Sequence, residues 1–137
     1  VIEITGKPFT ANLPRAGSTK YPEAKQFGLE VERENLDQRI DKRVEKMWEQ
    51  GFVEEVKTLI SAPGGMGKTA SQAIGYRQII SFLDGEISEG EAKELTKVAT
   101  RQYARRQETW FKRDERITWL SPNSNRLELL LSDILKS

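Results

Sequence analysis

Apolar residues recur at helical spacing through most of the chain. In the first such stretch Leu36, Ile40 and Val44 fall about one turn apart on a single face, with polar residues between them. The same period predicts helices over residues 36–50, 53–60, 69–84 and 89–113.

Cap signals set the ends of these helices. Asn35 is expected to cap the first helix and Gly51 to end it, and Thr69 is expected to cap the third. Ser88 and Glu91 have the spacing of a capping box in front of the longest helix.

Two short segments, residues 27–33 and 117–120, read instead as strands, and they would lack enough partners within this chain to form a sheet. The predicted fold class is therefore mostly α with one or two short strands. We expect a single portion, residues 1–137, in which a helical core of residues 36–113 stands between a loop, 6–26, and a closing strand and helix, 117–136.

The amino-acid composition excludes several classes of catalytic and metal site. The chain has no Cys and no His, which excludes thiolate nucleophiles, serine–histidine triads and the usual zinc sites. Lys and Arg number 22 against 21 Asp and Glu, so a polyanionic partner requires a local patch of charge. Without a membrane-spanning apolar run or a signal-peptide pattern, the protein is expected in the cytoplasm, and its opening VIEITGK suggests a piece of something longer.

The segment APGGMGKT, residues 62–69, fits a loose phosphate-loop pattern. A working phosphate loop follows a strand, whereas the preceding VEEVKTLI has helical spacing. The sequence therefore favours a Gly-rich connector between helices. A small phosphotransferase is the alternative, and the nucleotide binding of Lys68→Ala would decide between them.

The longest predicted helix has polar residues on the side expected to face the core. That side is defined by Leu95, Val98, Ala99, Tyr103 and Trp110. Gln102, Arg106, Thr109 and Arg113 fall on it too, so Arg106 and Gln102 either pair with protein groups or line a cleft for a polar ligand such as a phosphate.

The other side of this helix carries Lys93, Lys97, Arg101 and Arg105 at four-residue spacing. With the nearby aromatic residues, this cationic stripe is typical either of an RNA-binding surface or of a solvated helix face. Arg39 and Arg43, at the border of the first helix's apolar arc, allow the same two interpretations.

Several motifs stand in a distinctive order: TGKPF at 5–9, LDQRIDKRVEKMWEQGFVEEV at 36–56, TASQAIGYRQ at 69–78, LDGEIS at 83–88, ATRQYARRQETWFKRD at 99–114 and ITWL at 117–120. In this order they resemble the C-terminal portion of the bacterial tRNA dimethylallyltransferases, also called tRNA isopentenyltransferases. The resemblance implies the helical part of a P-loop-type α/β transferase.

That family moves the dimethylallyl group of dimethylallyl diphosphate to the exocyclic amine of the adenosine next to the anticodon. The resemblance implies dimethylallyl diphosphate and the tRNA anticodon stem-loop as partners, magnesium as cofactor, no membrane and a monomeric parent protein. The adenosine would be flipped into a tunnel, where basic groups stabilise the departing diphosphate.

The resemblance also assigns residues. Arg43, with Arg39 as helper, is expected to meet the diphosphate. One tRNA-binding segment is Gln72, Ala73, Ile74, Gly75, Tyr76 and Arg77, and the other is Arg105, Arg106, Gln107, Glu108, Thr109, Trp110, Phe111 and Lys112.

Parts of the family pattern are absent from these 137 residues. They include the N-terminal phosphate loop, the DSMQVYR-type motif whose Asp is thought to be the general base, and the inserted helical domain. No catalytic residue and no metal ligand is therefore expected in this segment, and the isolated chain is expected to be inactive although its parent is an enzyme. The alternative is a stand-alone helical RNA-binding module without catalysis.

Overall fold

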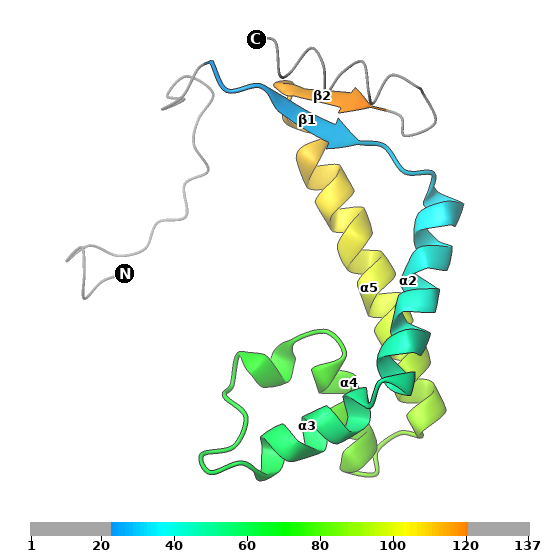
Figure 1. Ribbon diagram of the computed structural model, residues 1–137, viewed down its shortest axis with the longest axis vertical. Helices are drawn as coiled ribbons and strands as arrows, with labels where there is room; N and C mark the ends of the chain where they lie inside the picture. Colours follow the sequence, from blue (N-terminus) through cyan, green and yellow to red (C-terminus); the bar gives the residue numbers. More distant parts are fainter. Residues whose placement is uncertain (1–22, 121–137) are drawn as a thin grey trace, which may run out of the picture.

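Two long helices, α2 (Arg33–Glu49) and α5 (Glu89–Phe111), run antiparallel side by side, and the other elements lie at the two ends of this pair (Figure 1). The computed structural model describes residues 23–120. The expected closing helix after Pro122, and all of the expected loop before residue 23, lie outside the described residues. Within them, the fold is mostly helical with two short strands, as predicted.

The strands β1 (Gln26–Leu29) and β2 (Ile117–Leu120) pair in parallel, with Gln26 opposite Ile117 and Leu29 opposite Leu120. They lie at the end of the helix pair where α2 begins and α5 ends (Figure 1). The expectation that the strands would form no sheet was wrong, because the two segments, far apart in sequence, are each other's partners. The first strand also ends earlier than residue 33, since α2 begins there.

A small core lies at the other end of the helix pair. The helices α3 (Phe52–Ser61) and α4 (Tyr76–Leu83) pack there, and Phe52, Val56 and Ile79 are buried between them. Helix α4 also packs on the beginning of α5, where Ala92 is fully buried. This core anchors the segment that leads into α4.

The helix boundaries follow the capping signals in part. Ser88 and Glu91 form the predicted box: the Glu91 amide donates to Ser88 Oγ at 3.2 Å, and the Ser88 amide donates to the Glu91 carboxylate at 2.8 Å. Asn35 is not the cap of α2. The Glu32 carbonyl accepts the first helical bond, from the Leu36 amide at 2.9 Å, so Asn35 lies inside the first turn.

The predicted helix over 69–84 is broken into two pieces. A short 3₁₀ turn, η1 (Ala70–Gln72), is followed by extended backbone at Ala73, and α4 begins only at Tyr76. The break is fixed by Gly75, whose φ of +94° no helical residue adopts and whose missing side chain leaves room for the Phe52 ring. A Cβ at this position would lie 2.7 Å from that ring.

The Gly-rich connector between α3 and η1 matches its prediction. Residues 52–61 directly before it are helical, so the strand that a phosphate loop requires does not precede it. No helix among the described residues is long and apolar enough to cross a membrane.

The side of α5 predicted to face the core is largely exposed. Leu95, Tyr103 and Trp110 are 48%, 49% and 54% exposed, while Ala92, Thr96 and Lys97 are buried. The prediction was wrong because it placed the largest apolar residues inside. In the structure small residues pack on α4, and charged residues of α5 face complementary charges on α2.

Candidate functional site

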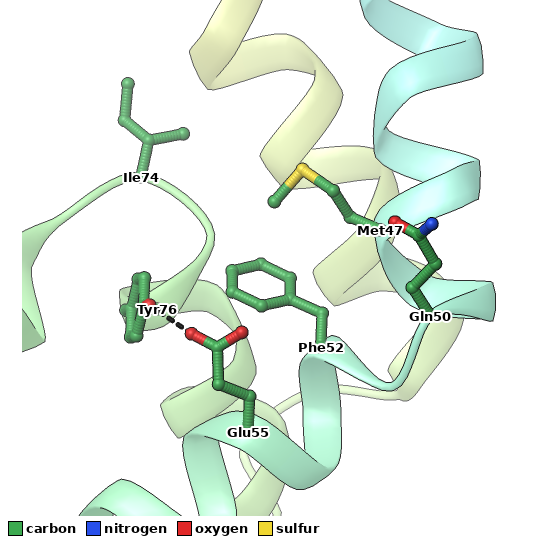
Figure 2. A pocket seen from close by; sticks show the side chains of 6 residues that line it. All are labelled: Met47, Gln50, Phe52, Glu55, Ile74 and Tyr76. Atoms are coloured by element: carbon green, nitrogen blue, oxygen red, sulfur yellow. Dashed lines mark hydrogen bonds between the residues drawn. The ribbon is translucent and has the colours of Figure 1, made fainter.

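A pocket of about 230 Å³ opens where α2, α3 and the segment before α4 meet (Figure 2). Its lining comes from α2 (Met47), the α2–α3 turn and α3 (Gln50, Phe52, Glu55) and the segment at α4 (Ile74, Tyr76). Apolar walls with a few polar groups are typical of pockets that hold a partly apolar ligand group.

The first predicted tRNA-binding segment, Gln72–Arg77, lies at this pocket. Ile74 and Tyr76 form part of its wall, whereas the side chains of Gln72, Ala73 and Arg77 are exposed beside it. Gly75 is buried against the Phe52 ring. The structure therefore presents most of this segment on the surface.

Tyr76 is held by two neighbours. Its ring packs edge-to-face on Phe52 with centroids 5.2 Å apart, and its hydroxyl donates to the Glu55 carboxylate (Figure 2). This hydrogen bond to Glu55 raises the pKa of Tyr76, so the hydroxyl stays a donor throughout the neutral range.

Arg39 and Arg43, predicted to meet the diphosphate, are both exposed on α2. Met47 follows Arg43 by four residues, which places the two on one side of α2. Among the described residues, no carboxylate forms an ion pair with either arginine. Both guanidinium groups are thus open to an anion.

The predicted cationic stripe on α5 faces α2, where a row of acidic residues balances it. Lys93 and Lys97 reach Glu45 at 2.9 and 2.6 Å, Arg101 reaches Asp41 at 3.1 Å and Arg105 reaches Asp37 at 3.5 Å. We call these pairs the α2–α5 ion ladder. The stripe is neither an open RNA surface nor a solvated face: it joins two helices, and only Arg105 keeps about half of its side chain exposed.

Ion pairing in the α2–α5 ion ladder stabilises the carboxylate form of Glu45 and the ammonium form of Lys97. The hydrogen bonds from Lys97 and Lys93 lower the pKa of Glu45, and those to Glu45 and Glu94 raise the pKa of Lys97. Lys97 is only 8% exposed and is consequently out of reach of an external phosphate.

In the second predicted tRNA-binding segment, Arg105–Lys112, some charged side chains form ion pairs within the protein and others do not. Glu108 pairs with Lys112 at 2.7 Å and with Arg33 at 3.7 Å, and the pairing with Lys112 lowers the Glu108 pKa. The exposed side chains without a carboxylate partner among the described residues are Arg106, Gln107, Thr109, Trp110 and Phe111. Trp110 and Phe111 pack edge-to-face with centroids 4.9 Å apart, and exposed aromatic rings of this kind can stack on bases.

Among residues 23–120, no three His, Cys, Asp or Glu residues gather closely enough to hold a metal ion. The acidic residues of α2 that point toward α5 are instead occupied by lysine and arginine side chains.

Comparison with known proteins decides the family. The model of the IPP transferase family matches residues 1–114. The chain belongs to the IPP transferase family.

Relatives within the family are similar over most of this chain. The tRNA dimethylallyltransferase of Thermobifida fusca is 57% identical over 120 residues, which is 88% of this chain and 37% of the relative. That of Streptomyces griseus is 52% identical over 120 residues, covering 88% and 38%. The chain thus spans under two fifths of the length of these relatives.

Solved IPP transferase structures share the fold. The tRNA Δ(2)-isopentenylpyrophosphate transferase of Staphylococcus epidermidis superposes with a TM-score of 0.72 at 37% identity, covering 83% of this chain and 37% of the other. The tRNA isopentenylpyrophosphate transferase of Bacillus halodurans also gives 0.72, at 32% identity, covering 81% and 37%.

Sequence reasoning missed most of the pocket. Phe52 was left out of the second helix, although an aromatic residue directly after Gly51 could have marked it as core. Glu55 gave no signal, because an acidic residue in an amphipathic helix is typical of solvated surface. Its partner Tyr76 lies 21 residues away and is brought to it only by the fold.

Proposed function

We propose that this chain forms the helical part of a tRNA dimethylallyltransferase. That enzyme transfers the dimethylallyl group of dimethylallyl diphosphate to the exocyclic amine of the adenosine next to the anticodon. The observation that carries the proposal is the 57% identity to the Thermobifida fusca enzyme over 120 residues. A parent enzyme of this kind works on tRNA in the cytoplasm, as a monomer.

In this reaction the chain binds and orients the two substrates, dimethylallyl diphosphate and tRNA. Arg43, with Arg39 beside it on α2, stabilises the negative charge of the departing diphosphate, and the exposure of both side chains supports this role. Segment Gln72–Arg77 and the exposed side chains of Arg105–Lys112 bind the anticodon stem-loop, and the α2 and α5 surfaces between them form part of the tunnel wall.

Catalysis requires more than this chain. The described residues contain no group of three metal-ligating side chains, and the general base that the family resemblance implies belongs to a motif absent from the 137 residues. We therefore expect the chain by itself to transfer no dimethylallyl group. Incorporation of labelled dimethylallyl into tRNA by the purified chain alone would contradict this part of the proposal.

A chimaera tests the proposal as a whole. In it, these 137 residues replace the matching portion of the Thermobifida fusca enzyme, 37% of that protein. We expect the chimaera to incorporate labelled dimethylallyl into tRNA, with the unmodified Thermobifida enzyme as the reference. A folded chimaera that binds tRNA but transfers nothing would favour an RNA-binding module instead.

A further inference from the structure

The hydrogen bond between Tyr76 and Glu55 joins α3 and α4 at the pocket, beside the core contacts that already hold the two helices together. Tyr76 is the first residue of α4, directly after Gly75, and Glu55 lies on α3 (Figure 2). Both side chains line the pocket, and the Tyr76 ring also packs against the core of Phe52, Val56 and Ile79. The bond consequently contributes to the shape of the pocket wall.

The backbone on either side of Tyr76 is fixed by different contacts. The Gly75 amide donates to Oε1 of Gln78 at 2.9 Å, and Gly75 itself lies against the Phe52 ring. These contacts set the path of the chain, whereas the Tyr76 side chain is held by the edge-to-face packing of its ring on Phe52 and by the hydrogen bond of its hydroxyl to Glu55. Among the described residues, the hydroxyl of Tyr76 has its hydrogen bond to Glu55 alone.

Glu55 is a surface residue of α3. Its side chain is exposed and forms no ion pair among the described residues, where its carboxylate accepts a hydrogen bond from the Tyr76 hydroxyl. The carboxylate holds the Tyr76 hydroxyl, and the Tyr76 ring together with Ile74 forms one wall of the pocket.

We propose that Glu55 is a positioning residue for tRNA binding: its carboxylate holds the Tyr76 ring so that segment Gln72–Arg77 presents one fixed surface to the RNA. This rests on the proposed function. A fixed ring lowers the conformational entropy that the segment loses on binding, so Glu55 acts on tRNA affinity without touching the diphosphate.

The test compares Glu55→Ala, Glu55→Gln and Tyr76→Phe in the chimaera. Glu55→Ala and Tyr76→Phe should each raise KM for tRNA about fivefold and leave KM for dimethylallyl diphosphate unchanged, since each removes one partner of the same bond. Glu55→Gln keeps an oxygen acceptor and should restore most of the affinity. The double variant Glu55→Ala/Tyr76→Phe should be no worse than either single variant.

Glu54→Ala is the matched control, because Glu54 neighbours Glu55 but pairs with Lys57 at 2.6 Å on the surface. It should leave both KM values unchanged. Equal rises in both KM values, no rescue by Glu55→Gln, or additive single effects would overturn the positioning role, and a lowered thermal midpoint in Glu55→Ala would assign the residue to folding. A folded but inactive parent chimaera would overturn the proposed function, and this inference with it.

Discussion

The Lys97 Nζ lies 2.6 Å from the Glu45 carboxylate, where α5 packs on the C-terminal half of α2. The Lys97 side chain is only 10% exposed, and its other partner, Glu94 on the same helix, is largely solvated. Lys97, whose place in the sequence allowed either an RNA-binding surface or a solvated helix face, is thus a structural contact between helices. Its consequences can be measured.

Replacing Glu45 should loosen the helix pair. Glu45→Gln leaves the Lys97 ammonium with Glu94 as its only described carboxylate partner, so we expect it to weaken the contact between α2 and α5 and to speed amide exchange in both helices. Hydrogen exchange of α2 and α5 amides in the chimaera measures this directly. Glu49→Gln, at an exposed position near the end of the same helix, is the control, and equal exchange in both variants would contradict the prediction.

The Glu45–Lys97 ion pair should stabilise the fold only within a limited range of pH. The pKa of Glu45 is lowered from its ordinary 4.5, so its stabilisation is present above that value and is lost as the pH falls through the lowered pKa. The pKa of Lys97 is raised from 10.5, so its share is present below that value and is lost as the pH rises past the raised pKa.

We therefore expect the stability difference between the chimaera and its Glu45→Gln variant to be constant from about pH 5 to about pH 9 and to shrink below about pH 4. Thermal unfolding followed over this range checks it. A difference that persists at low pH would show that Glu45 stabilises the helices by packing instead of charge.

Arg105 and Arg106 should differ in their effect on tRNA binding. Arg105 already pairs with Asp37, whereas Arg106 is exposed and has no carboxylate partner among the described residues. Arg106→Ala should weaken binding and reduce the slope of log affinity against log salt by about 0.9 for each phosphate that the variant no longer neutralises, and Arg105→Ala should do less. Filter binding across a salt series measures both, with Lys57→Ala as control; equal slopes in the two arginine variants would contradict the ordering.

Arg43 should act on the chemistry instead of on RNA affinity. In the chimaera, Arg43→Ala should lower turnover by about 10²-fold, the effect of removing one preorganised charge from a developing anion, and leave tRNA affinity nearly unchanged. Steady-state kinetics and tRNA binding separate the two. Loss of tRNA affinity alone would move Arg43 from the diphosphate site to the RNA surface, and Lys42→Ala, next to it on α2, tests for a general charge effect.

Two glycines should respond in opposite ways to the same substitution. Gly75→Ala forces a side chain into a backbone with φ of +94° and places Cβ 2.7 Å from the Phe52 ring, so it should destabilise the fold by about 1–3 kcal/mol. Gly90→Ala, in the first turn of α5 with open space around it, should stabilise by about 0.5–1 kcal/mol. Thermal unfolding of both variants tests the pair, and destabilisation by Gly90→Ala would contradict the open surroundings of that position.

Much of the local structure could be predicted from the sequence because it depends on neighbouring residues. The Ser88–Glu91 box, the strand at 117–120 and the helix predicted over 53–60 are each specified within a few positions. The order of the family motifs is likewise a property of the linear chain, and it pointed to the family that the comparisons confirm.

The tertiary structure alone decided which faces are covered. Helical period shows that α5 has two sides, but the α2 acidic residues determine that its lysines and arginines turn inward and that Tyr103 and Trp110 stay exposed. It also decided the break at Gly75 and the bond between Tyr76 and Glu55. Hydrophobic pattern records how apolar each residue is, whereas burial depends on what another segment brings to it, and that segment is distant in sequence.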